Sequence, residues 1–301
     1  LVTLMGRFAA ISQVIENYPA LTFSVFTMDN QDVIARDTLD AQKSLTRPWV
    51  SHWLDSRIIE HLAYNKTADI EIHYPGPMSE LDKAMAEPLI NVGVTKQTVA
   101  QKAKSAFFRR LLPWCSWGLT SMYLTRMDLF KLFLRLRSLP LPLELIKPSQ
   151  DSGLVCTSGV RFDWRTSLLA SWQTDTSKFE HLAKKLVPML LPRIFLECFQ
   201  LARDQLEDMP LPKRPRGIAT ANGFIYDDLF KIWVAEATVN QVPYLVLQHG
   251  GSYGTSQSWS RRVEVKTCDA FITWGWSYNP ESQLPGPITS PVAKVKGSDR
   301  K

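Results

Sequence analysis

The stretch from residue 216 to residue 276 constrains the fold more than any other part of the chain. Short apolar runs, each typical of a buried strand, occur at 216–221, 243–248 and 270–274, and helical periodicity covers 227–239. Strands alternating with a crossover helix are the order of a parallel sheet. The predicted fold class is therefore α/β, a Rossmann-like parallel sheet flanked by helices.

The rest of the chain reads mainly as helix. Helical spacing covers 1–18, 49–64, 95–138 and 176–206, and short strands are expected at 21–27 and 70–73. We group residues 1–278 as one domain with a helical insertion at about 98–206. Residues 279–301 are expected to be a linker.

Basic residues are concentrated in one segment, 101–150. It holds nine basic residues against two acids, whereas the whole chain has a net charge of +6. Aromatic residues are interleaved with these cations, so the segment could lie on an anionic membrane surface or contact an anionic substrate. The alternative is a pair of core-facing helices with solvated arginines. The longest uncharged window here, 111–125, is 15 residues and contains Pro113, which is too short to cross a bilayer.

The four cysteines are widely spaced and form no CxxC pair, which predicts free thiols rather than a zinc site or a disulfide framework. The chain begins inside an apolar helical run without a secretory signal, so we expect a fragment of a cytoplasmic protein, either free or peripheral at the inner face of the cytoplasmic membrane.

The segment 248–254 is the strongest candidate for a functional loop. It follows the apolar strand at 243–248, and ligands of open parallel sheets collect outside the carboxyl ends of the strands. Its three glycines, Gly250, Gly251 and Gly254, allow positive φ and a close approach of backbone N–H groups to phosphate or carboxylate. His249 could bind a ligand or carry a proton, or serve only as a structural hydrogen-bonding group. Tyr253 could stack on a sugar or cap the loop.

A second group of polar residues follows the strand at 216–221. If the two strands are parallel neighbours, Asn222 faces the same crevice as the glycine loop. Asp227 begins the next helix, where it could cap the helix or act as a general base, and it could pair with Lys231 four residues on. The candidate site residues are thus His249 and Asp227 as catalytic groups, and Asn222, Gln248, Gly250, Gly251, Tyr253, Gly254 and Lys231 as substrate-binding groups.

Other site classes have little support. The remaining histidines show no metal-ligand spacing, so neither a metal nor a cofactor is expected. A nicotinamide-dependent oxidoreductase is disfavoured because no GxGxxG occurs, and no recognised motif supports nucleic-acid binding. Arg161, Asp163 and Arg165 could bind an anion or form a surface ion pair.

Four blocks resemble a known family. They are Thr220-Ala221-Asn222, Asp227 to Glu236, Gln248 to Gly254, and Phe271 to Trp276. In this order and at similar spacing they are similar to the "TAN", acidic pair with "FKxW" and "AE", "QHGGxYG" and "TWGW" blocks of transferases encoded with bacterial O-antigen and surface-polysaccharide genes. Asp228 stands where that family often has Glu, and Ser252 is at a variable position.

The resemblance implies the N-terminal half of a GT-B-like two-domain enzyme, whose nucleotide-binding C-terminal domain would follow this chain. The expected function is sugar transfer from a nucleotide-sugar donor to a glycan or lipid-linked acceptor, with peripheral membrane contact through 101–150 and no nucleic acid. The alternative is a non-catalytic domain that binds a glycan or an anion.

Overall fold

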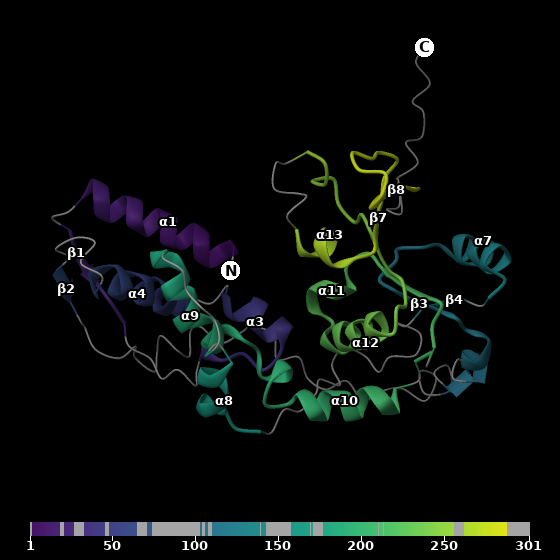
Figure 1. Ribbon diagram of the computed structural model, residues 1–301, viewed down its shortest axis with the longest axis horizontal. Helices are drawn as coiled ribbons and strands as arrows, with labels where there is room; N and C mark the ends of the chain where they lie inside the picture. Colours follow the sequence, from purple (N-terminus) through teal and green to yellow (C-terminus); the bar gives the residue numbers. More distant parts are fainter. Residues whose placement is uncertain are drawn as a thin grey trace, which may run out of the picture. The chain divides into compact units, whose positions relative to one another are not determined.

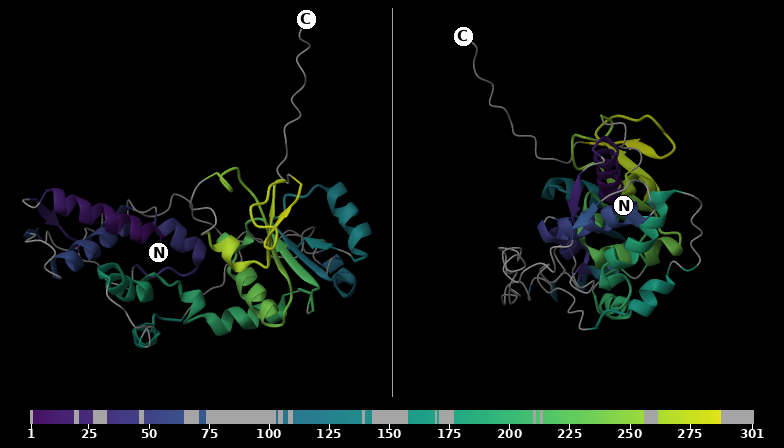
Figure 2. Two further views of the ribbon diagram at one scale, coloured as in Figure 1. Left: turned by 45° about the horizontal axis from the view of Figure 1, so that its top comes forward. Right: turned by 90° about the vertical axis from the view of Figure 1, so that its left-hand side faces the viewer.

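The computed structural model describes residues 2–18, 21–26, 33–45, 48–64, 71–73, 110–138, 140–142, 158–168, 170, 177–209, 211–212, 214–255 and 262–287, together with positions 103, 106 and 107. The chain divides into two compact units. Unit 1 comprises residues 1–92 and 154–202, and unit 2 comprises residues 93–153 and 203–301. Figure 1 labels their elements, and Figure 2 shows them from two further directions.

Unit 1 is mainly helical. Its elements are α1 (Val2–Asn17), β1 (Thr22–Ser24), α3 (Thr38–Leu45), α4 (Pro48–Tyr64), β2 (Glu71–His73), α8 (Phe162–Ser167), α9 (Lys178–Leu190) and the 3-10 turn η3 (Arg193–Phe195), and β1 pairs with β2 in parallel. The core packs around Trp53, Ile58 and Leu182. The helices expected at 1–18 and 49–64 are confirmed, as are short strands within 21–27 and 70–73.

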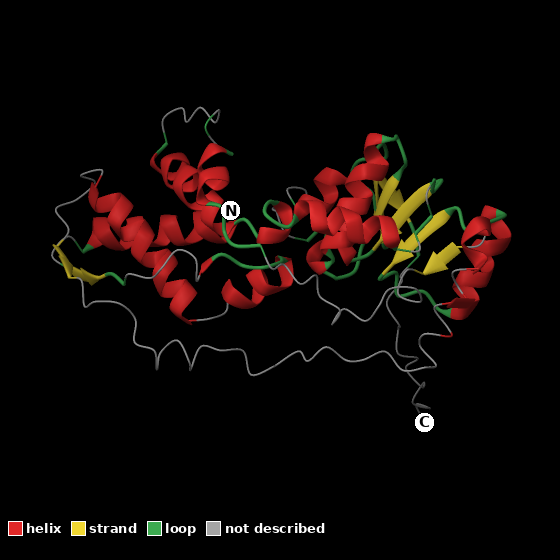
Figure 3. Cartoon of the chain, turned by 90° about the horizontal axis from the view of Figure 1, so that it is seen from below, coloured by secondary structure: helices red, strands yellow, loops and turns green. Residues whose placement is uncertain are grey.

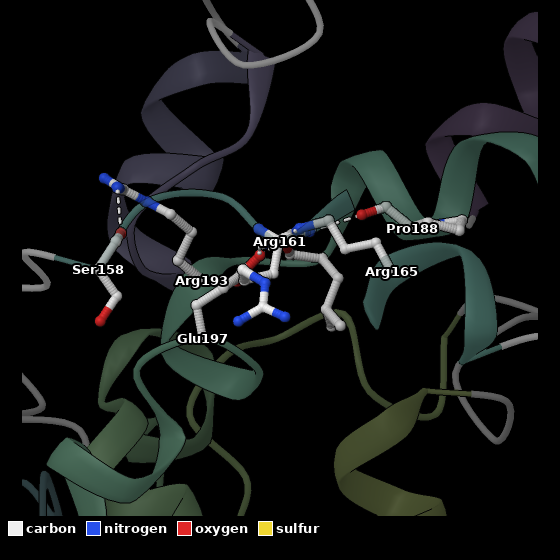
Figure 4. Close-up of polar contacts among 7 residues, drawn as sticks. Ser158, Arg161, Arg165, Pro188, Arg193 and Glu197 are labelled. Carbon is white, nitrogen blue, oxygen red and sulfur yellow. Dashed lines mark hydrogen bonds and ion pairs between the residues drawn. The ribbon is translucent and has the colours of Figure 1, made fainter. Parts of the chain in front are cut away.

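A buried ion pair joins three segments of unit 1 (Figure 4). The Arg165 guanidinium on α8 donates to the two carboxylate oxygens of Glu197, each at 2.7 Å. Its Nη1 also donates to the carbonyls of Pro188 and Leu191, at 2.6 and 2.7 Å. Neither charged side chain is more than 1 % exposed. This pair therefore fastens α8 to the end of α9 and to the turn that follows it.

The neighbouring Arg161 forms the surface ion pair that the sequence suggested, to Asp163 at 2.7 Å. Arg165 was grouped with them as a surface residue, and this placement is wrong. An arginine can be buried when every donor has an acceptor, and the acceptors of Arg165 come from segments 23 to 32 residues further along the chain.

Unit 2 is built on six described strands that are all parallel. In spatial order they are β4 (Pro140–Pro142), β3 (Trp117–Thr120), β5 (Gly217–Thr220), β6 (Tyr244–Leu247), β7 (Ala270–Thr273) and β8 (Gln283–Pro285). The helical elements are η1 (Leu112–Trp114), α7 (Arg126–Leu136), α11 (Gly223–Tyr226), α12 (Asp228–Val239) and α13 (Val263–Thr267), and α10 (Phe199–Asp208) contains the boundary between the units. Figure 3 shows the strands of this sheet flanked by helices. The predicted parallel α/β class is confirmed.

Strand β3 packs closely under α12. A Cβ added at Gly118 would lie 2.3 Å from the ring of Trp233 on α12. The absence of a side chain at Gly118 therefore lets the indole lie directly on the strand, and a larger residue would push the helix away from the sheet.

Three strands differ from the sequence expectation. β3 and β4 lie inside the range 98–206 that was predicted as a helical insertion, and β8 lies inside the predicted linker 279–301. The four residues of β3 are flanked by apolar residues at helical spacing, so the pattern around them indicated a helix, and their pairing with β5 shows the strand. Residues 288–301 of the linker lie outside the described residues.

Two further expectations meet the structure here. Cys115 and Cys268 are free thiols, whereas Cys198 is disulfide-bonded, so the prediction of free thiols is wrong at that position. Among the helices of the described residues, none has the length and apolar character needed to cross a membrane.

Candidate functional site

The carboxyl ends of the parallel strands bring the predicted residues to one edge of the sheet. β5 and β6 are adjacent and parallel, with Thr220 opposite Val246. Asn222 follows the first of these strands and His249 follows the second, so the expectation that they share an edge is confirmed. This is the side on which open parallel sheets bind ligands.

Gln248 holds the start of the loop. Its side chain is only 2 % exposed. The amide nitrogen donates to the carbonyl of Gly250 at 2.8 Å, and the amide oxygen accepts from the Trp274 N–H at 3.0 Å and from Trp276 Nε1 at 2.9 Å. The geometry thus gives Gln248 a framework role that joins the loop to the end of β7.

The three glycines of the loop are not equivalent. Gly254 has φ +77°, and an added Cβ would lie 3.4 Å from the Trp276 ring, so this position requires glycine. Gly250 and Gly251 are not in the left-handed region, so they do not use the positive φ that glycine allows. Nothing lies within 4 Å of a Cβ built on either of them. Their backbone is open to a ligand.

Tyr253 is buried, at 3 % exposed, beneath this open part of the loop. Its hydroxyl donates to Glu264 Oε1 at 2.7 Å, and its ring packs on Phe271 with centroids 5.0 Å apart. Burial and the bond to Glu264 raise the pKa of Tyr253 far above its usual value, so the phenol stays protonated. Of the two roles expected for Tyr253, the structure favours that of holding the loop.

Arg262 completes the support of the loop. Its guanidinium lies over the Tyr253 ring, 4.7 Å from the centroid, and donates to Ser252 Oγ at 3.0 Å. The same group lies 3.8 Å from Glu264 Oε1. Tyr253 therefore lies between the Arg262 cation, which contacts its ring, and the buried Glu264 carboxylate, which accepts its hydroxyl proton.

His249 is half-buried and connected to this buried group. Its Nδ1 lies 3.2 Å from the Tyr253 hydroxyl, and Phe224 on α11 meets the ring edge-on with centroids 6.2 Å apart. Burial lowers the pKa of His249, while the charge of Glu264 and a hydrogen bond to the Ala221 backbone act in the opposite direction. The net effect is a pKa below the usual value, which favours the neutral imidazole at pH 7.

The hydrogen bonds of the Tyr253 hydroxyl favour a proton on Nδ1 of the imidazole. This hydroxyl gives its proton to Glu264, so it can accept from His249 Nδ1. In that tautomer the lone pair is on Nε2. A neutral imidazole oriented in this way can accept a proton from a hydroxyl, and Glu264 would stabilise the cation that forms.

Glu264 and Arg262 were missed by sequence reasoning, which treated the residues before β7 as a polar stretch. The only sequence signal is a carboxylate between two valines, Val263 and Val265, in the short helix α13. Glu264 is 6 % exposed. Its partner Tyr253 is 11 residues away in the chain, and only the fold brings the two together.

Asn222 lies at the end of β5, as predicted. Its amide nitrogen donates to the Tyr123 hydroxyl, and its amide oxygen accepts from the Tyr226 hydroxyl at 3.2 Å. Tyr123 follows β3, the other neighbour of β5. Asn222 thus connects the β5 end to the β3 side of the sheet.

Asp227 is the N-cap of α12, and its carboxylate accepts from the Phe230 N–H at 3.0 Å. The capping role is confirmed, and its role as a general base stays a prediction. The ion pair that the structure gives for Lys231 is to Asp228, at 2.9 Å. Asp228 is nearly buried, so Lys231 neutralises a charge at the base of α12.

Nowhere in the described ranges do three or more histidine, cysteine or carboxylate side chains form a group that could hold a metal ion.

Comparison with known proteins gives one match. A family model described as LIC12162 family transferase covers residues 1–301. No curated protein matches the chain, and no solved structure does.

Proposed function

The chain belongs to the LIC12162 family of transferases, and we propose on this basis that it transfers a sugar from a nucleotide-sugar to a hydroxyl of a glycan or lipid-linked acceptor. The observation that carries the proposal is the neutral His249 imidazole at the carboxyl edge of the sheet, beside the open backbone of Gly250 and Gly251. Group transfer to a hydroxyl needs a base for the hydroxyl proton and donors for the departing phosphate.

In the proposed reaction, Nε2 of His249 removes the proton of the acceptor hydroxyl as its oxygen bonds to the anomeric carbon of the donor. The bond from that carbon to the nucleotide phosphate breaks, and the phosphate leaves with the electron pair. The imidazolium is stabilised by Glu264 through Tyr253 and by the Ala221 backbone, the two groups that raise the His249 pKa. The backbone N–H groups of Gly250 and Gly251 are suited to the phosphate.

The proposal includes a GT-B-like arrangement, in which a second Rossmann-like domain binds the nucleotide. It rests on the resemblance of the four sequence blocks, and it assigns to unit 2 the acceptor and the base. In this arrangement Asn222 faces the acceptor, and Lys231 positions α12 through Asp228.

The direct test is nucleotide release by the full-length protein across a panel of nucleotide-sugars, followed by mass spectrometry. We expect turnover of one donor, and a fall of about 10²- to 10⁴-fold in kcat for His249→Ala because the general base is lost. His181→Ala, an exposed histidine of unit 1, is the matched control and should turn over normally.

The alternative, a binding domain without catalysis, makes a different prediction. It requires that no donor is turned over with either a glycan or a lipid-linked acceptor, while His249→Ala weakens glycan binding. If His249→Ala turned over the donor at the normal rate, the protein would still be a transferase, but His249 would have only a structural role.

Peripheral membrane contact is the second part of the proposal, and α7 supports it. The buried side of α7 carries Leu129 and Leu132. Away from this side, the helix exposes four large apolar residues and two cations, which are Met127, Phe130, Phe133 and Leu134 with Lys131 and Arg135. A third exposed cation, Arg137, follows the end of the helix. Apolar side chains between cations suit a surface of anionic lipid.

Co-sedimentation with phosphatidylglycerol vesicles tests this contact. The protein should bind these vesicles and not phosphatidylcholine vesicles. The affinity of the double variant Phe130→Ser/Leu134→Ser for phosphatidylglycerol vesicles should fall at least about tenfold. Val239→Ser removes an even more exposed apolar residue from α12 and should bind normally. Equal binding by all three proteins would contradict a contact through α7.

A further inference from the structure

The strand order of unit 2 changes direction at β3. From β3 the chain adds β4 on one side, and then crosses to add β5 on the other side, followed by β6, β7 and β8. The crevice at such a change lies between the carboxyl ends of the two strands, and in open parallel sheets it is a preferred ligand site. Here those ends are the residues after Thr120 and after Thr220.

A pocket of about 300 Å³ lies at this place, and we call it the switch pocket. Leu119, Met122, Leu124 and Leu129 supply its apolar lining, and Tyr123 and Tyr226 supply aromatic rings with hydroxyl groups. Its volume is at the lower end of the range for small-molecule sites. Among the described residues that line it, none carries a charge.

The two phenol groups of the pocket are held in place by Asn222, and Ser121 adds a third hydroxyl to the lining. Its amide donates to Tyr123 and accepts from Tyr226, so both phenols are oriented by one side chain. Since Tyr123 uses its oxygen to accept from Asn222, its own hydroxyl proton is left to donate. Within the described part of the chain, no group accepts that proton.

The backbone that carries Tyr123 is strained. Ser121 and Tyr123 have φ of 50° and 53°, in the left-handed region that non-glycine residues rarely adopt. Strained positions of this kind cluster at ligand sites, where the surrounding structure enforces them. Here the strain places Met122 and Tyr123 in the lining of the switch pocket.

The switch pocket is connected to His249 through α11. Phe224 of this single turn contacts the His249 ring, and Tyr226 of the same turn lines the pocket. The pocket is therefore on the β3 side of α11, and the proposed base is on its β6 side.

We infer that the switch pocket binds an uncharged sugar ring, the terminal residue of the acceptor. Aromatic and aliphatic side chains suit the apolar face of a sugar ring, and oriented hydroxyl groups suit its hydroxyls. A phosphate or a uronate would lose its hydration here without a cation to replace it. The inference rests on the proposed function, because it identifies which partner of the transfer occupies the β3 side.

Titration calorimetry of the full-length protein with methyl glycosides of neutral hexoses, and no donor, tests the inference. We expect at least one neutral glycoside to bind, and methyl glucuronide and inorganic phosphate not to bind. Tyr123→Phe and Tyr226→Phe should each weaken binding about tenfold, since each removes one hydrogen-bonding hydroxyl. Met122→Trp should abolish binding by filling the pocket.

Two controls separate this result from folding and from catalysis. Tyr64→Phe alters an exposed tyrosine of unit 1 and should bind the glycoside normally, and thermal unfolding checks that each variant is folded. His249→Ala should retain glycoside binding although it loses turnover. The inference would be overturned if the folded variants Tyr226→Phe and Met122→Trp both bound the glycoside as well as the unaltered protein does. It would also be overturned if methyl glucuronide bound as tightly as the neutral glycosides. A protein that turns over a donor but binds no glycoside would overturn it as well.

Discussion

Two buried carboxylates, Glu197 in unit 1 and Glu264 in unit 2, show how similar groups serve different purposes. Glu197 is 1 % exposed, receives Arg165 through two hydrogen bonds, and accepts the Arg161 backbone N–H at 3.0 Å. Burial acts to raise the pKa of Glu197, but the hydrogen bonds from Arg165 and Arg161 outweigh it, so its pKa lies below the usual value. Both carboxylate oxygens of Glu197 are paired within the protein.

Glu264 is buried to a similar degree, yet its interactions lead outward. It accepts the Tyr253 hydroxyl at 2.7 Å, and Tyr253 in turn contacts His249 at the open edge of the sheet. A buried polar group that bonds only to a buried side chain and to the backbone, as Glu197 does, stabilises the fold. Glu264 is connected through Tyr253 to the half-buried His249, so its charge can change the pKa of that histidine.

The largest effect should follow from Glu197→Gln. This change leaves the Arg165 guanidinium buried without its counter-charge, so we expect a loss of about 3–5 kcal/mol in the free energy of unfolding. Urea denaturation followed by circular dichroism measures it. The double variant Arg165→Met/Glu197→Leu removes both charges and should recover most of the loss. A loss below about 1 kcal/mol for Glu197→Gln would mean that the pair is not needed for stability.

A smaller effect, on activity rather than stability, should follow from Tyr253→Phe. The change breaks the connection from Glu264 to His249 but keeps the ring on Phe271. Loss of a hydrogen bond to a charged group costs about 1.5–3 kcal/mol, so kcat should fall about 10- to 100-fold with little change in KM. Steady-state kinetics with the identified donor measures both. Tyr278→Phe, an exposed tyrosine, is the matched control, and equal kinetics in both variants would place Glu264 outside the reaction.

The smallest effect should be a displacement of the pH profile in Glu264→Gln. Glu264 raises the pKa of His249, so removing its charge leaves burial to lower that pKa further. The neutral base would then persist at more acidic pH, and the acidic limb of kcat/KM should move to lower pH. Glu281→Gln removes an exposed carboxylate and should leave the limb in place. A shift to higher pH would contradict the electrostatic link.

Sequence reasoning was most successful where a pattern is local. The strands at 216–221, 243–248 and 270–274 and the helix between the first two are confirmed, because each strand is an apolar run set apart from its neighbours and the helix shows its own hydrophobic period. The prediction that Asn222 and His249 lie at the same edge of the sheet followed from the adjacency of two parallel strands. β3 is as long as these strands, but it was missed because it lies among apolar residues at helical spacing.

What the sequence by itself determined is the parallel α/β class, the glycine loop and the position of His249 at a strand end. Only the tertiary structure decided which charged and polar groups meet: Arg165 with Glu197 across 32 residues, Asn222 with Tyr123 across 99, and Glu264 with Tyr253 in a buried pair. The physical reason is that burying a polar group is tolerated only when a partner is present. That partner is supplied by packing between distant segments, which no local pattern records.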